Sequence, residues 1–117
     1  MPDLNVVKFV NKVVPLGTST TVIYTCPTKH VAIIKLLAFS NKDTSDRTFD
    51  LSFTPSGSSA QQILDAFSIA VATNIVYVFD DGKPFFMSAG DALSGVGSSA
   101  SQVIALLAVE EFYDPTK

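Results

Sequence analysis

The nine residues from Val31 to Phe39 read VAIIKLLAF, and eight of these nine side chains are apolar. Alternation along a strand divides them between two faces, which are Val31, Ile33, Lys35, Leu37 and Phe39 on one and Ala32, Ile34, Leu36 and Ala38 on the other. Because both sets are apolar, the stretch predicts a central strand that is covered on both sides. We expect the Lys35 side chain to extend over its neighbours so that its ammonium group reaches solvent, or to pair with an acidic side chain.

Apolar blocks of similar length flank this strand, and Gly, Pro, Ser, Asn and Asp separate them. The clearest block is 47–54, in which Phe49, Leu51 and Phe53 alternate with polar residues. Further strands are predicted over 6–10, 20–26, 66–70, 75–79, 85–87, 92–96 and 102–113. This spacing, without long helical patterns, predicts an all-β fold, a single antiparallel β-sandwich that is jelly-roll-like with about eight strands. We expect residues 1–17 to form an N-terminal arm or first strand and residues 18–117 to form the sandwich domain.

Three connecting segments also have a predicted structure. Residues 11–17 are predicted to be a turn-rich connection. Residues 61–72 fit either a helical or a strand spacing, and we favour a short helical turn over 61–65 before the strand at 66–70. The residues 80–83 predict a hairpin loop with Gly82 in the left-handed conformation, so that residues 85–87 return beside 75–79.

The composition limits the class of protein. A chain of 117 residues predicts one domain. It is 47% hydrophobic with a mean hydropathy of +0.34, a surplus that predicts buried contacts with neighbouring chains. No apolar run approaches the ~18 residues of a membrane span. The eight basic residues are scattered and the net charge is −3, so we expect neither a membrane nor a nucleic acid as partner.

Cys26 is the only cysteine, so the chain has no internal disulfide, and we expect a small buried thiol. Residues 1–5 lack the basic and apolar segments of a secretory signal. Both observations predict a protein that is made and assembled in a reducing cytoplasm.

We expect no enzyme activity, because the groups of a catalytic site do not come together in the sequence. His30 is the only histidine, and a loop around Pro27 could bring it near Cys26, but no orienting acid accompanies them. The acidic pairs do not have the spacing of a metal or glycosidase site; they are Asp80 with Asp81, Asp43 with Asp46, and Glu110 with Glu111. We therefore predict no catalytic, cofactor or metal residues and no cofactor.

Three parts of the sequence resemble a known family. Residues 20–35 read TTVIYTCPTKHVAIIK, with a Tyr-Thr strand end, a Pro turn, a basic loop and an apolar strand with Lys that runs to an Asn; the matching residues are Tyr24, Thr25, Pro27, Lys29, Ala32, Ile34, Lys35 and Asn41. A later turn carries Met87, Ala89, Gly90, Asp91 and Leu93, and the last strand ends in Val109, Glu110 and Glu111. This pattern resembles the small β-sandwich virion structural proteins of tailed bacteriophages over residues 18–112. Cys26, the Phe85–Phe86 pair and residues 1–17 depart from it.

The resemblance implies a non-enzymatic virion protein, most simply a capsid decoration (cement) protein that forms a homo-oligomer, such as a trimer, and binds other virion proteins. The alternative is a tail or fibre accessory module that binds a host receptor or glycan, although the absence of Trp is unusual for a carbohydrate platform. The expected location is the virion, assembled in the host cytoplasm.

Apolar residues near segment ends are the interface candidates, because large apolar and aromatic side chains anchor protein interfaces. Those expected in the arm are Val6, Val7, Phe9 and Val10, and the others are Phe85, Phe86, Phe112 and Tyr113.

Overall fold

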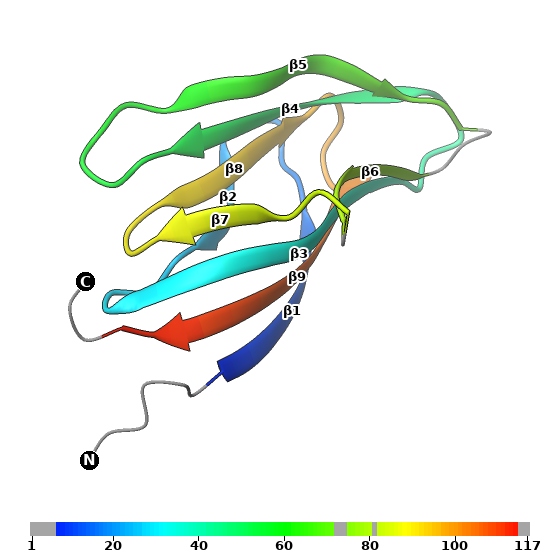
Figure 1. Cartoon of the computed structure of the whole chain (residues 1–117). Helices are drawn as coiled ribbons and strands as arrows, with labels where there is room; N and C mark the ends of the chain where they lie inside the picture. Colours follow the sequence, from blue (N-terminus) through cyan, green and yellow to red (C-terminus); the bar gives the residue numbers. More distant parts are fainter. Residues whose placement is uncertain (1–6, 72–74, 81, 115–117) are drawn as a thin grey trace.

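The computed structural model describes residues 7–71, 75–80 and 82–114, which form nine strands and no helix (Figure 1). The strands are β1 Val7–Pro15, β2 Thr21–Thr25, β3 His30–Asn41, β4 Arg47–Thr54, β5 Gln61–Ile69, β6 Ile75–Phe79, β7 Phe85–Ser88, β8 Ala92–Gly97 and β9 Val103–Tyr113. The predicted all-β sandwich class is confirmed. Among these described residues, no helix is long and apolar enough to cross a membrane.

The strands form two antiparallel sheets (Figure 1). The first sheet has the order β1-β9-β3, and both β6 and β7 pair with the free side of β3. The second sheet has the order β2-β8-β4-β5. Strands near the two ends of the chain therefore pair with one another, β1 with β9 and β2 with β8. Closer to the middle of the sequence, β3 pairs with β6 and β7, and β4 pairs with β5.

The predicted hairpin between 75–79 and 85–87 is wrong. Both β6 and β7 are antiparallel to β3, with Phe79 opposite Leu37 and Phe85 opposite Ile34, so they follow one another along one edge. The segment between them is a tight loop outside the ladder, closed by the Lys83 N–H to the Asp80 carbonyl (2.9 Å). Since β3 has 12 residues, one neighbour can be interrupted and then resume pairing. Among the described glycines the positive φ angles are at Gly57 and Gly90, not at Gly82.

The predicted faces of β3 are also only partly right. A β-bulge between Ile34 and Leu36 inserts one residue and shifts the alternation. The core-facing positions are therefore Ala32 and Ile34 before the bulge, and Leu37 and Phe39 after it. The other face, with Val31, Ile33 and Leu36, is half-buried, and no second layer of described residues covers it, contrary to the predicted burial on both sides.

Two further segments are strands where the sequence predicted otherwise. Residues 11–15 belong to β1 and stay in register with β9 as far as Pro15 opposite Ile104. Residues 61–65 belong to β5, so the predicted helical turn is wrong. Register shifts between β4 and β5 break the alternation of β5, which explains its helix-like apolar spacing. The Asp50 carboxylate holds β5 at one of these irregularities by accepting a hydrogen bond from the Ala66 N–H (2.7 Å).

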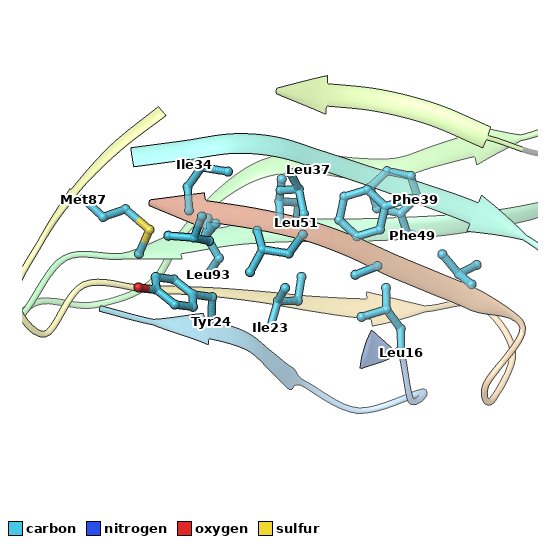
Figure 2. Packing of buried hydrophobic residues seen from close by; sticks show 14 of the residues in the cluster. Leu16, Ile23, Tyr24, Ile34, Leu37, Phe39, Phe49, Leu51, Met87 and Leu93 are labelled. Carbon is cyan, nitrogen blue, oxygen red and sulfur yellow. The ribbon is translucent and has the colours of Figure 1, made fainter. Parts of the chain in front are cut away.

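The core lies between the two sheets (Figure 2). Phe39 from the first sheet stacks on Phe49 from the second, with ring centroids 4.0 Å apart. Leu16, on the connection from β1 to β2, closes one end, where its N–H donates to the Val103 carbonyl (2.8 Å). Burial of each such side chain contributes about 1.5–3 kcal/mol, so this inter-sheet packing is the main stabilising term.

Candidate functional site

The outer face of the first sheet is the candidate functional site. Strand register brings one residue from each of four strands into a single row, Phe9 on β1, Glu110 on β9, Ile33 on β3 and Phe86 on β7. Successive residues of a strand point to opposite faces, so the row points away from the core-facing Val109 and Ile34. These four positions come from distant parts of the sequence and meet only through sheet pairing.

A second row lies at Leu106, four residues before Glu110 on β9, and all of its members are apolar or aromatic. It runs from Val13 on β1 through Leu106 and Ala38 to Tyr77 on β6. The most exposed side chains of the two rows are Phe9 (72%), Val13 (67%), Tyr77 (59%) and Phe86 (67%). Large apolar side chains that are exposed together on one face of a sheet indicate an interaction surface. The Glu110 carboxylate, which lies within this face, would be stabilised by a positively charged side chain of a partner.

The structure divides the predicted interface residues. Phe9 and Phe86 lie exposed in one row of the outer face, at opposite edges of the sheet. Phe112 is half-buried and stands opposite Val31 in the neighbouring row, and Tyr113 is half-buried with its ring against His30 at 5.6 Å.

Two of the predicted interface residues turn inward instead. Val10 packs against the core, and Phe85 stacks on Phe79 (4.8 Å) and meets Phe53 edge-on (5.2 Å). Val7 lies in β1 opposite Phe112, but its side chain is not among the described ones. Val6 lies outside the described residues.

Sequence reasoning missed Val13 and Tyr77. For Val13, the alternation that begins at Phe9 could have identified it, had the strand been extended past Val10. Tyr77 is the middle residue of the predicted strand 75–79, and only pairing with β3 shows which face it occupies.

A buried polar contact joins the two sheets at the other side of β9. The Tyr24 hydroxyl donates a 2.5 Å hydrogen bond to Glu111 Oε2. Burial, and then the nearby Glu111, raise the pKa of Tyr24 far above its ordinary value. Burial also raises the pKa of the Cys26 thiol to about 11. Both groups are therefore protonated near neutral pH, which suits a structural role.

The histidine and the thiol do not form a catalytic pair. The Cys26 thiol contacts the backbone carbonyl of His30 at 3.5 Å rather than the imidazole ring. His30 Nδ1 donates instead to the Thr28 carbonyl (2.7 Å), and the ring packs edge-on against Tyr113.

An open hollow of about 580 Å³ lies at the end of β3 and is lined by Ser40, Asn41, Lys42, Asp43, Thr44 and Val71. Two of its polar side chains have partners close by, one in the backbone and one in Arg47 outside the lining. Asn41 Oδ1 accepts from the Asp43 N–H (2.9 Å), and Arg47 forms a salt bridge with Asp43 that lowers the pKa of that carboxyl. Within the described ranges, no group of three or more His, Cys, Asp or Glu side chains could hold a metal ion.

Comparison with known protein families, with curated proteins and with solved structures found no match for this chain.

Proposed function

We propose that this chain is a non-enzymatic structural protein of a bacteriophage virion, where it decorates the capsid surface as a homo-oligomer. The observation that carries this proposal is the uncovered apolar outer face of the first sheet, with Phe9, Val13, Tyr77 and Phe86 exposed upon it. A face of this kind marks a surface that a partner protein covers. Assembly into a particle provides such a partner. A face that only binds other subunits needs no catalytic group.

We further propose that the sandwich is a jelly roll. If β6 and β7 count as one interrupted strand, eight strand positions pair first with last, second with seventh, third with sixth and fourth with fifth. This is the order of two interleaved Greek keys, an architecture used by viral capsid and lectin domains. A fold alone does not establish a function, so the strand order supports the virion proposal only together with the apolar face.

The proposal is tested on phage particles purified on a density gradient. We expect mass spectrometry to find peptides of this chain in a constant ratio to the major capsid protein, and cryo-electron microscopy to place it on the outside of the capsid. If the chain is absent from purified particles, the proposal is wrong. Density in a tail fibre instead would contradict the capsid assignment and support receptor binding.

The role of the face is tested separately with Phe86→Ser. The purified variant is added to particles that lack the chain, and its occupancy is compared with that of the wild type. We expect a loss of at least about tenfold in apparent affinity, since a buried aromatic anchor contributes 2 kcal/mol or more at an interface, by order of magnitude about 2–4 kcal/mol. Val22→Ser is the matched control, because Val22 is 57% exposed on β2 of the other sheet.

A further inference from the structure

The outer face of the first sheet carries opposite charges toward its two ends. Glu110 lies in the row with Phe9, Ile33 and Phe86. Lys42 follows β3 at the other end, and its N–H donates to the Gln102 carbonyl (3.0 Å). This bond continues the β3–β9 ladder by one position, which places Lys42 on the same outward face as Ser40.

Neither side chain has a partner within the part of the chain that the structure describes. Among the described residues, neither Glu110 nor the Lys42 side chain has a hydrogen-bond or ion-pair partner, and Lys42 is exposed. Lys35, at the bulge of β3, does have a partner. Glu110 and Lys42 are therefore the pair of opposite charges that the face can offer to another molecule.

The two charges are symmetric about the row that contains Leu106. Glu110 lies four residues after Leu106 on β9. Lys42 lies opposite Gln102, which is four residues before Leu106 on the same strand. At about 3.4 Å per residue, each charge is about 14 Å from this row. The row itself holds Val13, Ala38 and Tyr77 and is apolar.

We propose that this face binds the same face of a second copy of the chain, about a twofold axis that crosses the strands at the Leu106 row. The proposal rests on the proposed function, in which the chain assembles as a homo-oligomer, and it assigns this face to the contact between copies, so that Phe86→Ser lowers particle occupancy through loss of the dimer. Glu110 of each copy then pairs with Lys42 of the other, and the two apolar rows are buried between the sheets. Such a contact is isologous, so the same ion pair forms twice.

Charge complementarity selects this arrangement between the two ways of stacking the faces about a twofold axis. An axis that ran along β9, parallel to the strands, would place Glu110 opposite Glu110 of the other copy, and like charges that face one another across an interface are costly. An axis across the strands exchanges the two ends and places Glu110 near Lys42. Sheets that stack face to face lie ~10 Å apart at an angle of ~30°. At about 14 Å from the axis, this angle moves a point sideways by about 7 Å, or one to two strand spacings of ~4.8 Å. β3, which leads into Lys42, is a direct neighbour of β9.

The test is a charge-reversal cycle read by sedimentation equilibrium of the whole chain. We expect a wild-type dimer at micromolar concentration. Glu110→Lys and Lys42→Glu each create two repulsive contacts per dimer and are expected to weaken dimerisation by at least about tenfold. The double variant Glu110→Lys with Lys42→Glu restores both pairs in reversed order, and its dissociation constant is expected within about threefold of the wild type.

Asp65→Lys is the matched control, because Asp65 is exposed on β5 of the other sheet and its reversal is expected to leave the dimer unchanged. Circular dichroism and the urea midpoint confirm that each variant is folded. A wild-type chain that stays monomeric, a trimer, or a double variant no stronger than the two single variants would overturn the twofold contact.

Failure of the contact between copies and failure of the virion proposal give different results. If the double variant fails to restore the dimer and the chain is still found in particles, only the contact between copies is overturned. A coupled dimer of a chain that is absent from particles leaves the contact standing and overturns the proposed function.

Discussion

Tyr24 on β2 and Glu111 on β9 join the two sheets through a 2.5 Å hydrogen bond inside the sandwich. Glu111 is only 6% exposed, so its carboxylate depends on such donors in place of water. We expect Tyr24→Phe to lower the free energy of unfolding by about 1–3 kcal/mol, because it leaves a buried acceptor with one donor fewer. Urea denaturation measures the change. Tyr113→Phe, at a half-buried ring that meets His30 edge-on, is expected to stay within about 0.5 kcal/mol of the wild type. Equal losses in both variants would contradict the special role of Tyr24.

Alkaline pH is expected to destabilise the protein through Cys26 and Tyr24. Burial raises the pKa of Cys26 from its ordinary 9.0 to about 11, and burial also raises that of Tyr24 above its ordinary 10.0. Above pH 9.0 the unfolded thiol releases its proton while the folded thiol keeps it. The stabilisation is thus complete below pH 9.0 and is lost as the pH rises toward about 11, with Tyr24 adding to the loss above pH 10.0.

The check is a series of urea unfolding curves across this pH range. Cys26→Ala removes the thiol, so its stability is expected to fall less steeply between pH 9.0 and pH 10.0 than that of the wild type. The same slope in both proteins would show that the thiol does not cause the effect.

Gly90 is required at its turn for two separate reasons. Its φ of +86° is one that residues with a side chain rarely adopt, and an added Cβ would lie 2.5 Å from Ser56 Oγ and 2.9 Å from Ser56 Cβ. Gly57 has a similar φ of +74° but open space around the added atom. Gly57→Ala is therefore expected to cost about 1–2 kcal/mol for the backbone alone, and Gly90→Ala more than that. Thermal unfolding is measured for both variants and for Gly90→Ala combined with Ser56→Gly. The comparison separates the cost of the clash with Ser56 from the cost of the backbone conformation. The double variant is expected to recover the excess.

Phe49 anchors the inter-sheet core against Phe39 at a centroid distance of 4.0 Å. Both rings are at most 1% exposed. We expect Phe49→Ala to cost about 3–5 kcal/mol, because the cavity can close only partly between two sheets. Val22→Ala, on the exposed side of β2, is expected to change stability by no more than about 0.5 kcal/mol. A loss below about 1 kcal/mol for Phe49→Ala would falsify the assignment of this stack as a central core contact.

The strands themselves follow from local chemistry. Residues 47–54 and 75–79 are strands at the predicted bounds, since both are rich in β-branched and aromatic residues, which suit a half-buried pleated surface. A tight turn was also predicted over 89–91, and the Asp91 N–H donates to the Ser88 carbonyl (3.0 Å) to close it. Local patterns of this kind need no knowledge of distant residues.

The faces and the candidate site could not be read in the same way. The bulge at Ile34 and Leu36 reverses the alternation of β3, and it arises from pairing with β9 rather than from a local signal. For the same reason Phe85 and Phe86, adjacent in the sequence, separate into a core contact and an exposed side chain. Both residues were predicted to lie at an interface, but only the strand register shows which of the two side chains is accessible.

The sequence alone determined that this chain is an antiparallel sandwich with more apolar side chains than its interior holds, because composition and period-two alternation are local properties. Only the tertiary structure decided where the surplus lies. Hydrogen-bonded register between strands far apart in the chain collects Phe9, Ile33 and Phe86 around Glu110, and register is set by the whole set of paired strands rather than by any one of them.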